Sequence, residues 1–199
     1  MLTKNNLAIH LSHVKGFTHP KLQLEQYALA SETASLILWA AFMNNDIKGK
    51  IIADLGSGPG IIAKGSLLLG AKKVYCVEKD RKAFAILRKN IQEKNAILIN
   101  QDIQEFNNKV DVVIQNPPFG TKNKHADKHF LEKAMQIANK IYSLHKITSR
   151  SFISALAKDN NFAVEQLIPI KMQLKATYSF HKKPKHNIHL GLWVLKRKV

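Results

Sequence analysis

The sequence predicts an α/β protein whose core is a largely parallel β-sheet. Five short apolar runs rich in β-branched residues occur along the chain, and four of them are followed by a stretch with helical periodicity. Such runs are typical of strands that helices cover on both faces. Two further strand-like segments end the chain without a helix between them, which predicts an antiparallel edge. The runs lie at about 51–55, 73–77, 96–100, 110–115 and 141–144, and the final segments at about 162–174 and 188–196.

The helices are predicted from apolar periodicity and capping residues. A short helix is expected within residues 3–14, followed by a connector at 16–20. Ser31 is predicted to cap a helix that runs to about Asn44 and is apolar on most sides, so that helix should pack on the sheet. Asp80 is predicted to cap another helix that ends near residue 95. The remaining helices are expected at about 61–69, 127–139 and 149–159.

Length and composition indicate a globular chain with a single core. It has 199 residues, of which 45% are hydrophobic and 23% charged, as in soluble proteins. No run is apolar and long enough to span a bilayer and no signal-peptide pattern opens the chain, so we expect no membrane partner. The one cysteine, Cys76, lies in an apolar run, which excludes an intrachain disulfide and a cysteine-rich metal site. We therefore expect a cytoplasmic protein without a metal centre.

The net charge of +17 is unevenly distributed. Beyond Glu165 the chain carries eight Lys or Arg residues and no acid. A basic excess concentrated in one segment indicates a surface that faces phosphates. A solvated lysine face is the alternative interpretation.

A glycine-rich turn follows the first strand, Asp54-Leu55-Gly56-Ser57-Gly58-Pro59-Gly60, and a helix is expected from Ile61. Glycines at such a junction let the backbone approach a ligand that a Cβ atom would exclude. A dinucleotide-binding fingerprint would place its third glycine at position 61, and the lysine and hydroxyl of a phosphate loop are absent. A G-x-G-x-G turn preceded by Asp is instead the pattern of S-adenosylmethionine (SAM) binding, although such a turn also serves as a plain connector.

Acidic residues follow the second and third strands. Glu78 ends the second strand and is placed to accept both ribose hydroxyls of a nucleoside, because Asp80 is available to cap the following helix. Asp102, after the third strand, can accept from an adenine amine, with Ile103 against the ring. The glycine turn and both acids thus lie at the carboxyl ends of successive strands.

The fourth strand ends in Asn116-Pro117-Pro118-Phe119. The prolines stiffen the turn, and the Asn116 side-chain carbonyl and the Pro117 backbone carbonyl supply two acceptors. Two converging acceptors suit the two hydrogens of an exocyclic amine, while Phe119 can stack on the ring that carries it. We therefore interpret these four residues as catalytic; a proline-stiffened loop with a capping Asn is the alternative.

These motifs resemble the class I SAM-dependent methyltransferases that act on amines. Three further runs resemble a narrower family, the archaeal and eukaryotic enzymes that methylate the 6-amino group of an adenosine in small-subunit ribosomal RNA. These runs are Leu24–Tyr27, Asn116–Lys124, and Tyr142–Lys146 together with Phe180–Lys183. The resemblance covers nearly the whole chain. It implies one Rossmann-like domain over 1–199, with a helix and cofactor-covering segment at 1–30, a core at 31–199, and a seven-stranded sheet of order 3-2-1-4-5-7-6 whose last strand is antiparallel.

The resemblance also implies the cofactor contacts. Within this sequence they fall on Gln26, Gly56, Pro59, Ile61, Glu78, Asp102 and Ile103, and the glycine-turn pattern adds Asp54, Gly58 and Gly60. A threonine contact of the family falls on Leu29, which cannot make the same hydrogen bond. Ala28 and Leu29 replace the Pro-Thr or Arg-Thr that is common there, and Glu78 replaces the more common Asp. A longer carboxylate can still bind a ribose.

The implied partners are structured RNA, namely small-subunit rRNA, and a small zinc-binding activator protein that pairs along the third strand. We expect RNA contacts from basic and histidine residues rather than metal binding, since the histidines lack metal-ligand spacing. The expected RNA-binding residues are Lys122, Lys124, His145, Lys146, His181, Lys182, Lys183 and Lys185.

Two other functions remain open at this level. A methyltransferase on the same scaffold could act on the 2-amino group of guanine or on a glutamine amide of a translation factor, because the N-P-P-F turn suits all three. A noncatalytic RNA-binding protein that retains the fold is the other alternative.

Overall fold

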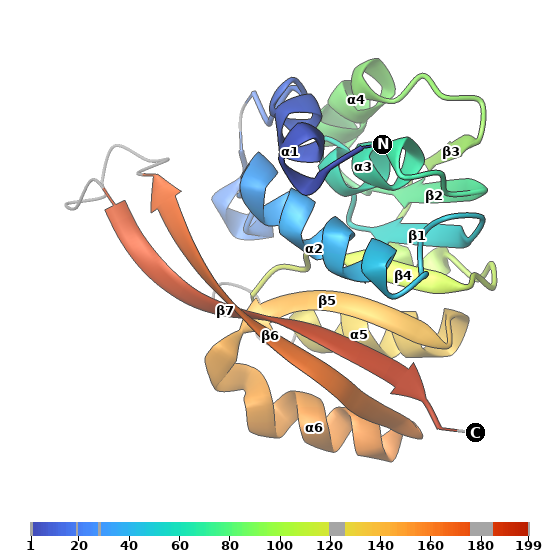
Figure 1. Cartoon of the computed structure of the whole chain (residues 1–199), viewed down its shortest axis with the longest axis vertical. Coiled ribbons are helices and arrows are strands. Elements are labelled where there is room, and N and C mark those ends of the chain that lie inside the picture. Colours follow the sequence, from blue (N-terminus) through green and yellow to red (C-terminus); the bar gives the residue numbers. More distant parts are fainter. Residues whose placement is uncertain (1, 19, 28, 120–125, 176–184, 199) are drawn as a thin grey trace.

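The chain folds around one seven-stranded sheet. The structure is a computed structural model that describes residues 2–18, 20–27, 29–119, 126–175 and 185–198. The strand order is β3-β2-β1-β4-β5-β7-β6, and only β7 runs antiparallel to its neighbours (Figure 1). This confirms the predicted fold class, order and antiparallel strand. The strands are β1 (Ile51–Leu55), β2 (Lys73–Val77), β3 (Ala96–Ile99), β4 (Val112–Gln115), β5 (Lys140–Lys146), β6 (Phe162–Lys175) and β7 (Lys185–Arg197).

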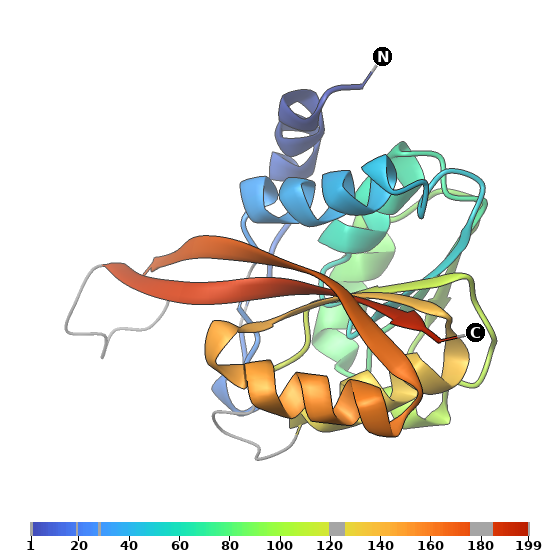
Figure 2. The ribbon, with the colours of Figure 1, turned by 60° about the horizontal axis from the view of Figure 1, so that its bottom comes forward.

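Helices cover both faces of the sheet. One buried apolar cluster joins one face of the sheet to four helices, and a second joins the opposite face to the two others (Figures 1 and 2). Neighbouring residues of a strand alternate between the clusters: Ile52 belongs to the first and Ala53 to the second. Burial on both sides explains why the strands read as unbroken apolar runs. The helices are α1 (Lys4–Ser12), α2 (Ser31–Met43), α3 (Ile61–Leu68) and α4 (Arg81–Asn90) on the first face, and α5 (Ala126–Ile137) and α6 (Arg150–Asp159) on the second.

One predicted helix end and one predicted helix cap are wrong, whereas the predicted start of α2 at Ser31 agrees with the structure. The helix expected to reach residue 95 ends at Asn90, whose side-chain amide donates to the carbonyls of Lys15 and Pro59. The next residue, Ile91, takes an extended backbone and is buried in the first cluster. Ser31 does not cap α2: Ala30 occupies the cap position, without a side-chain hydrogen bond, and Ser31 is the first helical residue. Asp80, by contrast, caps α4 as predicted.

The last two strands extend beyond the rest of the sheet. The pairing of β5 with β7 stops at Lys146 and Leu190, whereas the pairing of β6 with β7 continues to Lys175 and Lys185. Residues 171–175 and 185–189 therefore form a two-stranded arm, and no other described strand pairs with it. Because β7 is antiparallel, the arm projects past the end of the sheet at which the parallel strands terminate (Figures 1 and 2).

Candidate active site

A cavity of about 600 Å³ opens at the carboxyl ends of β1, β2 and β4. These strands are neighbours in the sheet, so their terminal side chains meet at one edge, where open α/β sheets bind ligands. Most of the predicted site residues line this cavity. They are Gln26, Leu29, Asp54, Gly56, Gly58, Pro59, Ile61, Glu78, Asp102, Ile103, Asn116, Pro117, Pro118 and Phe119.

Gly60 is the one predicted cofactor residue of the described turn that does not line the cavity. A Cβ atom on Gly60 would lie 2.5 Å from Leu87 Cδ1, so its Cα faces α4 instead. Its φ of +94° at the start of α3 is a second reason for glycine there. The third glycine of the turn is therefore required for helix packing, and its predicted contact with the cofactor stays a prediction.

Asp54 is a buried carboxyl at the floor of the cavity, with 1% of its surface exposed. Its Oδ2 atom accepts a hydrogen bond from the backbone N–H of Ala63, 3.1 Å away, in the first turn of α3. Burial raises the pKa of Asp54 to about 8; this amide bond opposes the shift, and nearby Glu78 adds to it. Asp54 thus ties β1 to α3 and provides a carboxyl that a positive ligand would deprotonate.

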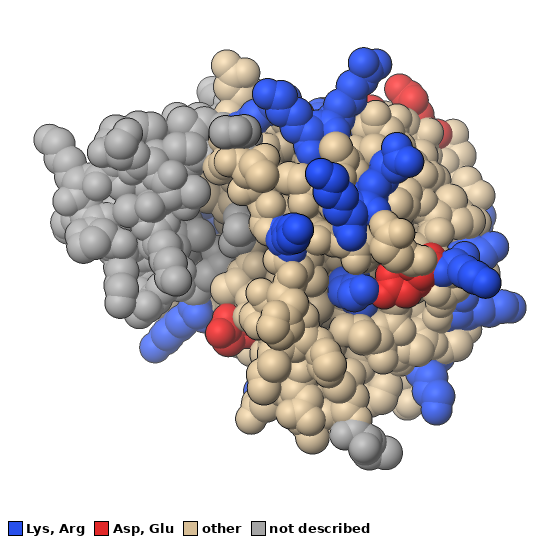
Figure 3. All heavy atoms as spheres, turned by 90° about the horizontal axis from the view of Figure 1, so that it is seen from above, with Lys and Arg blue, Asp and Glu red and all other residues tan. Residues whose placement is uncertain are grey.

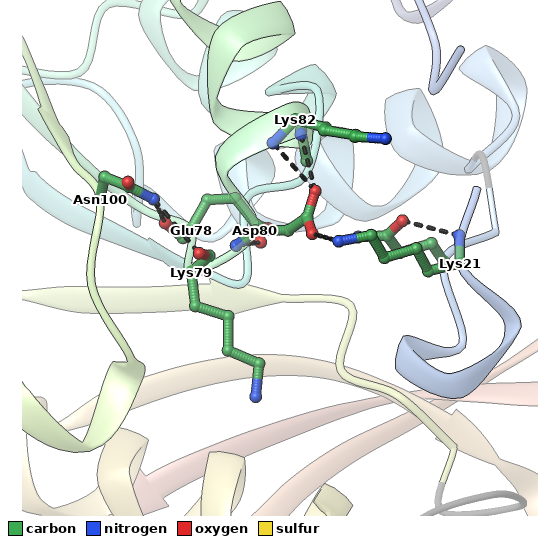
Figure 4. Close-up of polar contacts among 8 residues, drawn as sticks. Lys21, Glu78, Lys79, Asp80, Lys82 and Asn100 are labelled. Atoms are coloured by element: carbon green, nitrogen blue, oxygen red, sulfur yellow. Dashed lines mark hydrogen bonds and ion pairs between the residues drawn. The ribbon is translucent and has the colours of Figure 1, made fainter. Parts of the chain in front are cut away.

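Glu78 links the end of β2 to the glycine turn. Its Oε2 accepts from the N–H of Gly58 at 2.8 Å. Its Oε1 accepts from the N–H of Asp80, which follows it two residues later, at 2.7 Å; both residues are labelled in Figure 4. Asp80 rather than Glu78 caps α4, as predicted, although two backbone amides already bind the Glu78 carboxylate. Each carboxylate oxygen can accept more than one hydrogen bond, so the pair can still receive ligand hydroxyls. Burial raises the pKa of Glu78 despite these two amides.

Asp102 closes the cavity beside β3. Its Oδ1 accepts from the N–H of Gln104 at 3.0 Å, and its Oδ2 lies 3.4 Å from Lys79 Nζ. The neighbouring Ile103 is buried and lines the same cavity. A carboxylate beside an apolar side chain is suited to a flat ring that carries an amine.

The turn after β4 presents an unsatisfied acceptor. Among the described residues, Asn116 Oδ1 is buried and has no hydrogen-bond partner. A buried carbonyl without a donor is unfavourable by about 1–3 kcal/mol, so it is a site at which a ligand N–H would be stabilising. Phe119 is half-buried against the first apolar cluster, and its backbone N–H donates to Glu25 Oε2 at 2.8 Å.

Several cavity residues are absent from the sequence prediction, and Glu25, Phe17 and Phe130 are three of them with direct contacts to the predicted turns. Glu25 holds the Phe119 amide, while the Phe17 and Phe130 rings pack on Gly58 and Gly56 at the sites where Cβ atoms would lie. Glu25 lies in a run that the sequence linked to a family but to no role. The two rings come from α5 and from the segment before α2, and no local pattern marks them.

The predicted RNA-binding set is corrected at His145. This histidine lies inside β5, is 1% exposed, and its Nε2 is 2.7 Å from Ser143 Oγ. Burial lowers its pKa to about 3, so it is neutral and cannot contact RNA. Lys146 is half-buried at the end of β5. Lys122, Lys124, His181, Lys182 and Lys183 lie outside the described residues, and Lys185 belongs to β7 but its side chain is not described.

Two global features accompany the site. No helix in the described ranges is both long and apolar enough to cross a membrane. The same ranges contain no group of three or more His, Cys, Asp or Glu side chains that could hold a metal ion.

The family match agrees with this geometry. Residues 30–152 match the family described as "Methyltransferase small domain". That segment includes the glycine turn, the acids after β2 and β3, and the turn after β4. The sheet order and this match define a Rossmann-like methyltransferase.

Relatives narrow the class. The chain is 35% identical to "rRNA N(6)-adenosine-methyltransferase METTL5" of Danio rerio, over 90% of this chain and 92% of that protein. It is 34% identical to the Drosophila melanogaster relative of the same description, over 96% and 95% of the two chains. The crystal structure of PH1948 from Pyrococcus horikoshii is 40% identical, has a TM-score of 0.94 and is matched over 100% of both chains. The chain therefore belongs to the METTL5 family of rRNA N6-adenosine methyltransferases.

Proposed function

We propose that this chain transfers a methyl group from SAM to the exocyclic 6-amino group of an adenosine in small-subunit rRNA. The observation that carries the proposal is the buried, unpartnered Asn116 Oδ1 in a cavity that also contains Glu78 and Asp102. The names of the relatives support rRNA adenosine as the substrate class.

The residues present fit SAM. Gly56 and Gly58 have positive φ angles of 69° and 53°, and the Phe130 and Phe17 rings lie where their Cβ atoms would be, so only glycine fits at these two cavity positions. We assign the ribose to Glu78, and the adenine to Asp102 and Ile103; Gln26, Leu29, Pro59 and Ile61 complete the wall. Bound SAM supplies a methyl group on a positively charged sulfur.

The chain's part in the reaction is mainly orientation. Asn116 Oδ1 and the Pro117 carbonyl would accept the two amine hydrogens and so direct the nitrogen lone pair toward the methyl group. Phe119 would stack on the flipped base and offset part of the few kcal/mol that unstacking costs. Such orientation can contribute up to about 7–11 kcal/mol to lowering the barrier. This mechanism needs no strong base, and His145, neutral and buried, does not serve as one.

Basic surfaces beside the cavity support RNA as the partner. Helix α4 exposes Arg81, Lys82, Arg88 and Lys89 and contains no acid, and Lys and Arg outnumber acids on the face shown in Figure 3. The arm of residues 171–175 and 185–189 projects at the same end of the sheet as the cavity and also lacks acids.

Salt dependence tests the basic stretch that connects the last two strands in the sequence. Replacing Lys182, Lys183 and Lys185 with alanine should weaken rRNA binding and flatten its dependence on salt, by about one unit of logarithmic slope for each phosphate that the variant no longer neutralises. SAM affinity should stay unchanged. Equal slopes for the parent and the triple variant would mean that these lysines do not contact RNA phosphates and are simply solvated.

We also propose that a small zinc-binding activator protein pairs with β3. This strand is the edge of the sheet, and among the described strands it pairs only with β2. Ile97 is 38% exposed on it, and edges with apolar side chains need cover. A monodisperse monomer that is fully active at micromolar concentration would remove the need for this partner. We further propose a cytoplasmic location, because the sequence has one cysteine, Cys76, and so cannot form an intrachain disulfide.

Product analysis tests the function directly. Small-subunit rRNA incubated with the protein and labelled SAM should yield labelled N6-methyladenosine by mass spectrometry of nucleosides. Label in N2-methylguanosine, or in a glutamine of a translation factor, would assign the scaffold to another amine. Calorimetry that detects no SAM binding would instead support a noncatalytic RNA-binding protein.

A further inference from the structure

Residues 21–27 precede α2 and contribute part of the cavity wall; we call this segment the strap. The strap closes on itself, because the N–H groups of Leu24 and Gln26 donate to the Lys21 carbonyl and the Lys21 N–H donates to Gln26 Oε1 at 2.9 Å. Leu24, Glu25, Gln26 and Tyr27 all line the cavity. The strap is therefore a compact unit at the cavity, although only its first residues form a helical turn.

One anchor of the strap is on the cofactor side. The Lys21 ammonium pairs with the Asp80 carboxylate, which also caps α4 (Figure 4). The pKa of Asp80 is lowered: burial would raise it, but the hydrogen bond from Lys21 and the backbone amides of α4 outweigh that effect. This anchor lies two residues beyond Glu78, whose Oε1 accepts from the Asp80 N–H.

The other anchor is on the catalytic turn. Glu25 Oε2 accepts from the Phe119 N–H at 2.8 Å. Pro117 and Pro118 have no N–H, so Phe119 carries the first backbone donor after Asn116. Glu25 is 7% exposed and has a φ of +49°, a conformation that a residue with a side chain adopts at a cost in free energy. The fold thus holds a strained residue where its carboxylate reaches the turn.

The two anchors lie on opposite sides of β1. Lys21 reaches the end of β2, Glu25 reaches the turn after β4, and both strands neighbour β1. The strap therefore connects the end of β2 to the turn after β4, on either side of the strand that carries the glycine turn. Gln26 follows Glu25 in the strap and lines the cavity, and its Oε1 accepts from the Lys21 N–H, so a ligand in the cavity would contact the strap there.

We propose that Glu25 is a positioning residue that fixes the catalytic turn through the Phe119 amide, and that the strap couples cofactor binding to the setting of this turn. This inference rests on the proposed function, which places SAM beside Glu78 and the acceptor base beside Asn116 and Phe119. Cofactor binding and acceptor binding should then favour each other reciprocally.

The test compares Glu25→Ala with Glu25→Gln, and uses Asp159→Ala as a control, since Asp159 is exposed at the far end of α6. Hydrogen exchange of the peptide that contains Asn116 and Phe119 is measured with and without S-adenosylhomocysteine. In the parent and in Asp159→Ala, the ligand should slow exchange of the Phe119 amide. In Glu25→Ala, exchange should be at least about tenfold faster and should no longer respond to the ligand. Glu25→Gln keeps a carbonyl acceptor and should restore most of the protection.

A kinetic readout separates positioning from simple stability. Glu25→Ala should lower kcat for rRNA methylation while changing the KM for SAM less than about threefold, and Glu25→Gln should recover most of kcat. If Glu25→Ala exchanges like the parent in both ligand states, the inference is wrong. Exchange is measured without RNA, so a parent that fails to methylate rRNA would overturn the proposed function and leave the test of the strap intact.

Discussion

The two ends of the cavity differ in how far the protein has already satisfied their polar groups. At the cofactor end, Asp54 accepts from Ala63, and Glu78 accepts from Gly58 and Asp80. At the acceptor end, Asn116 Oδ1 is buried without a donor among the described residues. One end is therefore built and held by backbone amides, whereas the other retains an unmet hydrogen bond.

This difference has a chemical consequence. Carboxylates fixed by backbone amides stay in place while a cofactor enters and leaves, so the cofactor end binds without rearrangement. An unpaired carbonyl gains most from a donor that replaces no existing hydrogen bond. The acceptor end can thus favour an amine with two hydrogens over a group that has none.

The largest effect is expected at the acceptor end. Asn116→Ala should reduce the rate of methyl transfer by at least about a hundredfold, because small losses of orientation cost that much. Calorimetry should find SAM affinity within about twofold of the parent. A variant that transfers methyl groups at the parent rate would remove the proposed role of Asn116.

The matching change at the cofactor end is Glu78→Lys. SAM affinity should fall by about ten- to a hundredfold, since hydrogen bonds to a charged group contribute about 1.5–3 kcal/mol. Glu93 is a poor control for this charge reversal, because it is half-buried and pairs with Lys64 at 2.5 Å. Asp159→Lys is therefore the better control. If both charge reversals bind SAM equally, Glu78 does not hold the ribose.

The affinity for SAM should depend on pH through the two buried carboxyls of the cofactor end. Burial raises the pKa of both Asp54, to about 8, and Glu78. Positively charged SAM favours the ionised carboxyls, so binding should release protons and its affinity should rise as pH increases toward 8, by at most about tenfold per pH unit for one proton. Calorimetry in two buffers of different ionisation enthalpy measures the release. Proton uptake on binding would contradict this account.

A smaller effect is expected beneath the acceptor end, in global stability. Gln115 Nε2 donates to Ser143 Oγ, which contacts His145 Nε2, and all three side chains are buried. The folded pKa of His145, about 3, is below its usual value of about 6.5, so below pH 6.5 only the unfolded chain takes up this proton. The free energy of unfolding should therefore decrease as the pH is lowered from 6.5 to about 3, and His145 should contribute at most about 1.4 kcal/mol of this decrease per pH unit.

Urea unfolding from pH 7 to pH 4 measures that slope. His145→Gln should be less stable at pH 7, because it loses packing and a hydrogen bond. Its unfolding should take up about one proton fewer over this pH range, so its stability should depend less steeply on pH. The same slope in the parent and the variant would mean that His145 is protonated in the fold.

The sequence predicts most of the fold because its signals are local. Apolar runs such as 51–55 and 73–77 coincide with β1 and β2, and the acids that end strands reach the cavity. The errors arise where distant contacts decide. His145 looked basic and exposed beside Lys146, yet its strand lies between β4 and β7, which bury it. The packing of Gly60 against Leu87 of α4 is likewise a distant contact that the local motif does not reveal.

The same reason explains which site residues the sequence could not assign. Glu25 meets Phe119 across 94 positions of the chain, and no local pattern encodes that contact. The contacts of Phe17 and Phe130 with the glycine turn depend on helices and loops that the fold brings together. Roles that follow a strand end were predictable, and roles that bridge two segments were not.

The central claim is that Asn116 receives the amine of the target adenosine, and a double-substitution cycle tests it most directly. An rRNA fragment that carries the modified adenosine is compared with one in which purine, lacking the 6-amino group, replaces it. Affinity is measured with S-adenosylhomocysteine bound, for the parent and for Asn116→Ala. Loss of the amine should weaken binding to the parent about tenfold more than it weakens binding to Asn116→Ala, which retains only the Pro117 carbonyl as an acceptor; the difference is the value of one hydrogen bond. The same loss in both proteins would contradict the claim.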